Sequence, residues 1–247
     1  TANMLVEKLN ETCEIAEKIE VAGVGFINFF IKSEVLAEII NTVIDAKDDY
    51  GKNNSGNNLK ILVEYVSANP TGPLHCGHAR GAAWGDVICR LLKKSGYDYF
   101  REYYINDAGN QIDMLGESIY GRYRQYYGLD FTIPADGYYG EDIIEITKEI
   151  IDDVGDNYLH SAKQEAVDFF KWEGRNRQLN RIKADLAYYG CHFDSWVSEK
   201  SIVDENRVEK ALEKMISMNL TYQQDGAFWF KSTEYGDDKD RVLKKSD

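Results

Sequence analysis

Apolar residues near the start of the chain recur at helical spacing, among them Leu5, Leu9 and Ile19. This pattern predicts an acidic, amphipathic helical segment over residues 1–20. Residues 21–31 contain two glycines followed by an apolar run rich in Phe and Ile. Such a run is typical of a turn that leads into a strand, so we expect one helix and one strand in the first 31 residues.

The next amphipathic stretch carries its apolar residues on one stripe, from Val35 to Ile44, and Ser33 precedes it. Serine is a favoured N-cap residue, so we expect a helix that Ser33 caps. Residues 51–58 are rich in Gly, Asn and Ser. That composition is typical of a linker, and we place a domain boundary there.

Residues 59–66 are rich in β-branched side chains and almost continuously apolar, which predicts a buried parallel strand. A loop over 70–77 separates this strand from a helix over 77–94, and Gly96 ends that helix. Residues 97–105 predict a second strand, and a further helix is expected over 108–127. Strand, Gly-containing loop, helix and strand in this order form the βαβ unit of a nucleotide-binding α/β fold.

Beyond residue 130 the pattern is mostly helical, with helices expected over 141–153, 158–189 and 204–218 and room for a short strand over 191–197. Residues 221–230 predict a β-hairpin, because Asp225-Gly226 suits a type I′ turn and residues 227–230 are strong strand formers. The expected fold class is therefore α/β, with a large and mostly helical insertion.

Acidic residues outnumber basic ones by 42 to 29, which gives a net charge of −13 with neutral histidines. This balance argues against a general binder of nucleic acids or anionic membranes, since such proteins normally carry a basic face. Residues 60–130 are the exception, because they hold as many basic as acidic residues. No apolar run approaches the ~20 residues that span a bilayer, and no leader peptide is visible. The four cysteines form no CxxC pair, as expected of reduced thiols in a cytoplasmic protein.

One segment carries recognisable chemistry: ANPTGPLHCGHAR, from Ala68 to Arg80, follows a strand and opens a helix. Ligands of open α/β sheets bind beyond the carboxyl ends of strands, and a helix N-terminus suits phosphate. Gly77 would let a ligand approach the backbone, and His75 and His78 could face one ligand and donate N–H groups to its phosphate oxygens. The alternative is a Gly-rich turn in which the two histidines merely cap the helix.

The same segment resembles the first ATP-binding motif of class I aminoacyl-tRNA synthetases, and the longer match resembles arginyl-tRNA synthetases. Three further stretches support this resemblance in the family's order: VAGVGFINFF at 21–30, EYYINDAGNQ at 102–111, and DGAFWF at 225–230 followed by DDKDRVL at 237–243. The resemblance implies a Rossmann-like catalytic domain that uses ATP with Mg²⁺ to activate arginine as arginyl-adenylate and transfers it to tRNA(Arg). It also implies a monomeric, cytoplasmic enzyme without a membrane partner.

The resemblance further assigns site residues. It implies that the catalytic residues are His75 and His78, that ATP is bound by His75, Gly77 and His78, and that arginine is bound by Glu64, Ser67, Asn69, His78 and Gln111. The chain is expected to supply no metal ligand.

Glu64 also has a physical argument, because a guanidinium substrate needs a planar carboxylate partner and Glu64 lies near the end of the strand that leads into the motif. The alternative for Glu64 is an ion pair with a structural Lys or Arg. Asn106, Asp107 and Gln111 follow the second strand, again at a carboxyl edge. A place beside the site and an ordinary N-cap role for Asn106 or Asp107 explain this position equally well.

The resemblance implies four parts. Residues 1–32 would be the tail of an N-terminal, tRNA-contacting domain, 33–58 a helix and linker, 59–130 the first half of the Rossmann-like ATP-binding domain, and 131–247 the helical insertion with its hairpin. The second ATP motif, the rest of the arginine pocket and the main tRNA-binding surfaces are expected beyond Asp247. We therefore expect the chain to be a truncated synthetase that is inactive by itself.

Two other functions remain open. Another class I-type nucleotidyltransferase would use the same phosphate chemistry, although the long insert over 131–220 and the set Glu64, Ser67 and Asn69 argue against it. A non-catalytic module derived from a synthetase is the second, and the intact His75 and His78 argue against that.

Overall fold

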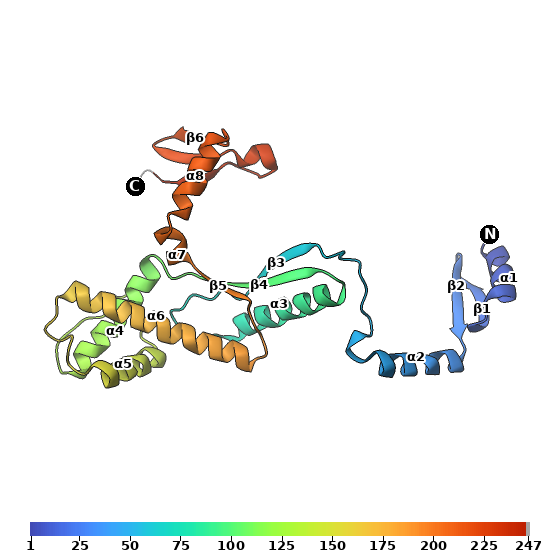
Figure 1. The fold of residues 1–247 in the computed structure, drawn as a ribbon, viewed down its shortest axis with the longest axis horizontal. Helices are drawn as coiled ribbons and strands as arrows, with labels where there is room; N and C mark the ends of the chain where they lie inside the picture. Colours follow the sequence, from blue (N-terminus) through green and yellow to red (C-terminus); the bar gives the residue numbers. More distant parts are fainter. Residues whose placement is uncertain (246–247) are drawn as a thin grey trace. The chain divides into compact units, whose positions relative to one another are not determined.

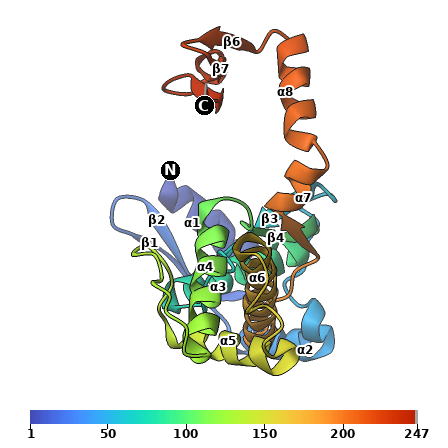
Figure 2. The same cartoon turned by 90° about the vertical axis from the view of Figure 1, so that its left-hand side faces the viewer.

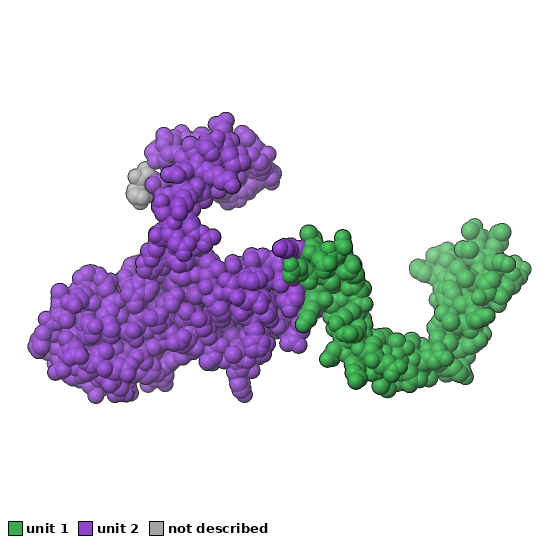
Figure 3. Space-filling view, in the orientation of Figure 1, with its two compact units in different colours: residues 1–59, 91–98 green, residues 60–90, 99–247 purple. Residues whose placement is uncertain are grey.

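The computed structural model describes residues 1–245. The chain divides into two compact units, one made of residues 1–59 with 91–98 and the other of residues 60–90 with 99–247 (Figure 3).

The first unit begins with a helix and an antiparallel hairpin, whose bounds are α1 Ala2–Thr12, β1 Ala16–Ala22 and β2 Phe26–Ile31 (Figure 1). The strand expected to end at Ile31 is confirmed, but the helix expected over 1–20 is wrong beyond α1. Residues 16–22 pair with β2 instead, with Ile19 opposite Phe29. Ile19 is the buried residue of β1, and pairing with β2, which local spacing does not reveal, makes this segment a strand and not a helix.

Helix α2 (Ser33–Ala46) follows, and a short 3₁₀ turn, η1 (Lys47–Asp49), ends it. The expected helix is confirmed, but its cap is not: Lys32 is the N-cap residue and Ser33 is the first helical residue. The Gly/Asn-rich stretch that follows is a loop held by backbone hydrogen bonds. The amide of Asn53 donates to the carbonyl of Lys94 over 2.9 Å, so residues 51–58 fold back onto the end of the helix that contains Lys94.

The second unit contains a three-stranded sheet in the order β3-β4-β5, with bounds β3 Lys60–Glu64, β4 Asp98–Ile105 and β5 Ser195–Ser198. Strands β4 and β5 are parallel. The amide of Asp98 donates to Leu59, and that of Tyr65 donates to Glu102, so β3 runs in the same direction as β4.

Helix α3 (Cys76–Lys94) connects β3 to β4, which confirms the expected βαβ unit (Figure 1). Strand β3 is less buried than its apolar sequence predicts, since Leu62 is 59% exposed. Within residues 1–245 β3 lies at the edge of the sheet and pairs with β4 alone.

Three helices form a layer beside one another, as Figures 1 and 2 both show: α4 Asn110–Tyr126, α5 Glu141–Val154 and α6 Lys163–Tyr188. Their core contains fully buried Leu115, Ile119, Tyr123, Ile146 and Phe170. A second cluster, with Tyr103 and Ile105 of β4 against Ile182 and Leu186, packs α6 onto the sheet. Helix α6 therefore joins the helical layer to the strands that carry the motif. The helices expected over 108–127, 141–153 and 158–189 are confirmed, the last with a later start.

The remaining elements are α7 Glu199–Asp204, α8 Arg207–Ser217, β6 Thr221–Gln224, β7 Ala227–Phe230, η2 Ser232–Tyr235 and β8 Arg241–Lys244. The hairpin β6–β7 is confirmed, with positive φ at both Asp225 and Gly226 as a type I′ turn requires. The helix expected over 204–218 is divided, because Asn206 adopts the left-handed conformation before α8 begins. No helix of residues 1–245 is both long and apolar enough to cross a bilayer.

Candidate active site

The candidate site begins in the loop that follows β3. Val66 and Ser67 both have positive φ, 67° and 41°, which is costly for a β-branched residue such as valine. Strand β4 holds the loop in this conformation. The hydroxyl of Tyr103 donates to the carbonyl oxygen of Ala68 over 2.9 Å, and the amide of Tyr104 donates to Oγ of Ser67 over 3.0 Å. Tyr103 is fully buried, so its hydrogen bond to Ala68 attaches the loop to the core of the second unit.

Ser67 connects this loop to Glu64. Its hydroxyl donates to Oε1 of Glu64 while its oxygen accepts from the amide of Tyr104. The carboxylate of Glu64 is exposed at the end of β3, and no Lys or Arg of residues 1–245 forms an ion pair with it. The alternative of a structural ion pair for Glu64 is therefore wrong for the part of the chain that the structure describes.

Asn69 contacts the start of helix α4. Its Nδ2 donates to Oε1 of Gln111, in the first turn of α4, over 2.5 Å. The structure thus brings Asn69 together with Gln111, while Ser67 contacts Glu64. Gly109 is the N-cap residue of α4, so the alternative in which Asn106 or Asp107 caps this helix is wrong.

His75 and His78 lie at the start of α3 and cap it reciprocally. Nδ1 of His75 accepts from the amide of Gly77 over 3.1 Å, and Nδ1 of His78 accepts from the amide of His75 over 3.3 Å. This is the logic of a capping box, with imidazoles in place of hydroxyl and carboxylate. The two histidines therefore do cap the helix, as the alternative interpretation proposed. Capping uses Nδ1 of each ring and leaves Nε2 available for a ligand.

That second nitrogen has a defined protonation state. A ring whose Nδ1 accepts a hydrogen bond is neutral there, so the proton of a neutral imidazole must reside on Nε2. Within residues 1–245 neither Nε2 has a hydrogen-bond partner. Burial, and then the neighbouring His75, lower the pKa of His78 below its usual value, which favours the neutral form. The pair therefore offers two N–H donors at the N-terminus of a 19-residue helix.

Gly77 has a steric reason in the fold. A Cβ added there would lie 2.9 Å from Cε1 and 3.0 Å from Nδ1 of His75, closer than real side chains approach. The missing side chain therefore makes room for the ring of His75. A cavity of about 290 Å³ adjoins the same ring, between the start of α3 and the end of α6.

Negative charge surrounds the ends of the strands. Burial raises the pKa of Tyr104, and the carboxylates of Glu199, Asp107 and Glu64 raise it further. Glu199 and Asp107 follow β5 and β4, and Glu64 is the last residue of β3, so all three acids lie at the carboxyl ends of strands. Arg175 already pairs with Asp107, but no Lys or Arg of residues 1–245 pairs with Glu64 or Glu199, and these two carboxylates suit a cationic group.

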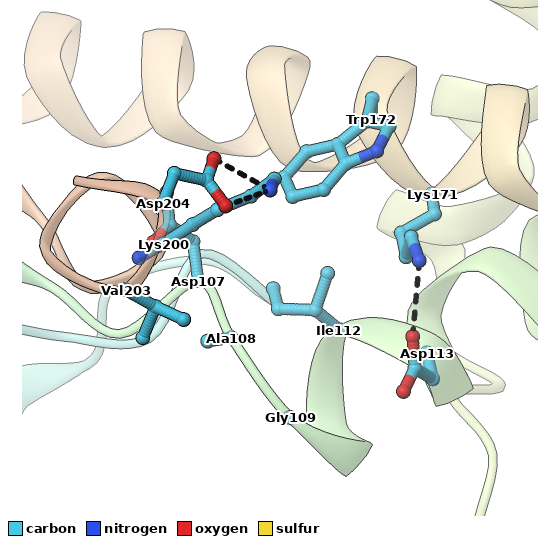
Figure 4. A pocket seen from close by; sticks show the side chains of 10 residues that line it. All are labelled: Asp107, Ala108, Gly109, Ile112, Asp113, Lys171, Trp172, Lys200, Val203 and Asp204. Carbon is cyan, nitrogen blue, oxygen red and sulfur yellow. Dashed lines mark hydrogen bonds and ion pairs between the residues drawn. The ribbon is translucent and has the colours of Figure 1, made fainter. Parts of the chain in front are cut away.

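The sequence places Asp107 at this edge but carries no signal for its partner. Asp107 is 1% exposed and is bound by Arg175, which lies 68 positions further along the chain. A second cavity of about 230 Å³ opens beside it, with Trp172 and Lys200 in its wall (Figure 4). Tyr103 could have been found as an inward position of an alternating strand, although not its bond to Ala68.

Comparisons with known proteins agree with this α/β architecture. Residues 39–247 match the family model described as tRNA synthetases class I (R), catalytic domain, and residues 1–31 match that of the arginyl tRNA synthetase N terminal domain. The chain belongs to the family of class I tRNA synthetase catalytic domains. The matching model describes the arginine-specific branch of this family. The expected Rossmann-like class I fold is thus confirmed.

Individual relatives carry the same description. Arginine–tRNA ligase 1 of Halalkalibacterium halodurans is 51% identical over 246 residues, which is 100% of this chain and 44% of that protein. A solved structure described as an arginyl-tRNA synthetase of Campylobacter jejuni is 34% identical and superposes with a TM-score of 0.75, over 87% of this chain and 47% of that one. The arginyl-tRNA synthetase of Thermus thermophilus, 23% identical with a TM-score of 0.59, shares the fold over 99% of this chain and 42% of that one. The chain thus spans less than half the length of the relatives it matches.

Proposed function

We propose that the chain is the first half of the catalytic region of an arginine–tRNA ligase. The observation that carries the proposal is the pair of Nε2–H donors of His75 and His78 at the N-terminus of α3, together with the exposed carboxylate of Glu64 at the carboxyl end of β3. The joining of ATP to arginine needs N–H groups that donate hydrogen bonds to phosphate oxygens. It also needs a carboxylate that accepts hydrogen bonds from the guanidinium of arginine.

The phosphate half of the site would act by positioning and charge stabilisation. The arginine carboxylate attacks the α-phosphorus of ATP and pyrophosphate leaves, while His75 and His78 donate Nε2–H groups to phosphate oxygens as negative charge grows on them. Mg²⁺ would enter with ATP and neutralise the leaving phosphates. Oxygen ligands suit that ion, and no group of three or more His, Cys, Asp or Glu within residues 1–245 is arranged to hold a metal.

The arginine half would use the loop after β3. Glu64 would pair with the substrate guanidinium, and Ser67, which holds Glu64, would fix the orientation of its carboxylate. Asn69 and Gln111, joined at 2.5 Å, would bind the polar end of arginine together with His78. The negative charge around Tyr104 supports a cationic substrate.

The four parts assigned from the sequence complete this proposal. Residues 1–32 would belong to a tRNA-contacting domain, 33–58 to a helix and linker, 59–130 to the ATP-binding domain, and 131–247 to the insertion. tRNA(Arg) would bind mostly through regions outside the chain, and the whole enzyme would act as a monomer in the cytoplasm.

A hybrid enzyme tests the proposal. Residues 1–247 of this chain replace the matching 246 residues of the Halalkalibacterium halodurans relative, and arginine-dependent ATP–pyrophosphate exchange is measured with tRNA(Arg) present. We expect exchange in the hybrid and none in the chain alone. His78→Ala should lower the rate by ~10²–10³-fold, as for other single donors to a developing charge. His160→Ala, an exposed histidine outside the site, is the matched control and should leave the rate unchanged.

The same hybrid separates the competing functions. A folded hybrid that shows no arginine-dependent exchange would contradict the proposal. Exchange driven by another acid or amine instead of arginine would favour a different nucleotidyltransferase. Nucleotide binding by the chain that His78→Ala leaves unchanged would favour a non-catalytic module.

A further inference from the structure

A buried carboxylate outside the proposed set of binding residues connects three elements behind the site. Oδ1 of Asp107 accepts from the amide of Lys200 over 3.0 Å and from the hydroxyl of Ser198 over 2.9 Å. Its Oδ2 accepts from Nε of Arg175 over 3.1 Å and from Nη2 of the same guanidinium. With only 1% of Asp107 exposed, the end of β4, helix α6 and the β5–α7 junction all converge on one side chain.

The position of Asp107 in the chain makes this convergence important. Strand β4 ends at Ile105 and helix α4 begins at Asn110, so Asp107 lies in the middle of the short connection between them. Gly109, with φ of 83°, gives that connection little conformational restraint of its own. Two residues further on, Gln111 accepts the hydrogen bond from Asn69. The connection therefore needs an external anchor if Gln111 is to meet Asn69.

We propose that Asp107 is a positioning residue for the arginine site: it anchors residues 106–110 to Arg175 and to the start of α7, and thereby places Gln111 against Asn69. The inference rests on the proposed function, because it assigns Asp107 a part in that same site. Asp107 touches no substrate itself. Its effect passes through the bond between Asn69 and Gln111, and so falls on arginine rather than on ATP, whose proposed donors lie on α3.

The charges around Asp107 are matched for this role. The guanidinium of Arg175 is 15% exposed and faces the carboxylate with two of its nitrogens, which fixes direction as well as charge. The amide of Lys200 donates from the first turn of α7, where a negative charge is favoured. The ammonium group of Lys200 points elsewhere, to Asp204 at 2.7 Å (Figure 4).

A matched control lies in the same cavity wall. Asp113 is also in the first part of α4 and also pairs with a cation, Lys171, at 3.2 Å (Figure 4). Its side chain is 55% exposed, and within residues 1–245 it bridges no strand end to α7. Removing the charge of Asp113 therefore changes a surface pair and leaves the anchor intact.

The test compares Asp107→Asn with Asp113→Asn in the hybrid enzyme. Asp107→Asn keeps the size of the side chain but removes the charge and turns an NH₂ group toward Arg175 or Lys200. We expect the KM for arginine to rise about tenfold while the KM for ATP stays within twofold, and Asp113→Asn to leave both within twofold. A purely structural role would raise both KM values together, or would lower the unfolding temperature with no change in either, and both results overturn the proposal.

A second measurement uses the 247-residue chain by itself, outside the hybrid enzyme, because it does not depend on catalytic activity. Amide hydrogen exchange at residues 114–116, in the part of α4 where amides are hydrogen-bonded within the helix, should accelerate at least tenfold in Asp107→Asn and remain unchanged in Asp113→Asn. Unchanged exchange in both variants overturns the inference. If the wild-type hybrid lacks arginine-dependent exchange, the proposed function fails, and this second measurement still decides whether Asp107 anchors the connection. If Asp107→Asn does not fold, Ser198→Ala, which removes one donor to the carboxylate, takes its place in both experiments.

Discussion

The rings of His75 and His78 stack on one another, with centroids 3.8 Å apart and an angle of 18° between their planes. Both rings accept a backbone hydrogen bond at Nδ1. Burial, and then the neighbouring His75, lower the pKa of His78 below its usual value. Protonation of Nδ1 of His78 would also remove the hydrogen bond by which that ring caps the helix.

The first prediction concerns pH. Because the pKa of His78 is lower in the folded chain than its ordinary value of 6.5, the neutral ring stabilises the fold fully above pH 6.5. That contribution is lost as the pH falls through the lower, folded-state pKa. Chemical unfolding between pH 7.5 and pH 5 should thus show a steeper loss of stability in the wild type than in His78→Gln. Glutamine at this position can still accept the capping bond but does not titrate. Parallel stability curves for the two proteins would contradict the role of His78.

The second prediction concerns Gly77 and separates two effects of an added Cβ: displacement of the His75 ring and a higher helix propensity. Gly77→Ala should lower the exchange rate of the hybrid enzyme at least tenfold, because the new Cβ forces His75 out of its position. Stability should change little, since alanine favours the helix by about 0.5–1 kcal/mol while the displaced ring costs a capping bond. The control is Gly81→Ala in the same helix, where no atom lies within 4 Å of the added Cβ. That variant should be slightly more stable and equally active, and a matching loss of activity in both variants would refute the steric argument.

Much of this site could be predicted from local sequence. The βαβ unit and the facing of His75 and His78 follow from short-range patterns: an apolar, β-branched run, a Gly-containing loop and an Ala-rich helix in which the two histidines are three residues apart. The choice of Nδ1 for capping could not be predicted, because it depends on backbone geometry at the first turn of α3. Residues 16–22 were misassigned because a strand and a helix can share the same few apolar positions, and pairing with β2 decides between them.

The contacts behind the site are of another kind. Asp107 meets Arg175 and Ser198, which are 68 and 91 positions away, and Asn69 meets Gln111 at a separation of 42. Such pairs depend on how α6 and β5 return to the sheet, and a single sequence carries no record of them. Family resemblance assigned Gln111 to the site, but only the fold shows that it holds Asn69.

The third prediction concerns that pair. Gln111→Ala removes the acceptor of Asn69, so the KM for arginine in the hybrid enzyme should rise about five- to tenfold, the value of one neutral hydrogen bond. Gln111 is exposed, so the unfolding temperature should hardly change. Asn110→Ala, the exposed neighbour at the start of α4, serves as the control. Equal arginine KM values for the two variants would show that the bond between Asn69 and Gln111 does not shape the site.

The last prediction concerns the packing that places the motif on the sheet. Gly85, in the middle of α3, has no room for a side chain, because an added Cβ would lie 2.2 Å from the ring of Tyr65, which directly follows β3. Tyr65 is only 9% exposed and its ring is also packed against Phe193, 4.5 Å between centroids, so it has little space to retreat. Gly85→Ala should therefore destabilise the chain by about 1–3 kcal/mol despite the better helix propensity of alanine, whereas Gly81→Ala stabilises it.

Urea unfolding of the 247-residue chain measures both effects, and a double-mutant cycle with Tyr65→Ala identifies the partner. Tyr65→Ala removes Cγ and Cδ2, the two ring atoms that would lie 2.2 Å from the added Cβ, but leaves a cavity, so it is destabilising alone. Adding Gly85→Ala to it should cost much less than Gly85→Ala costs in the wild type. Strictly additive energies would mean that Tyr65 is not what Gly85 accommodates. Non-additive energies would establish that Gly85 and Tyr65 are in contact. This contact would hold α3 against the start of the loop that follows Glu64 and contains Ser67 and Asn69.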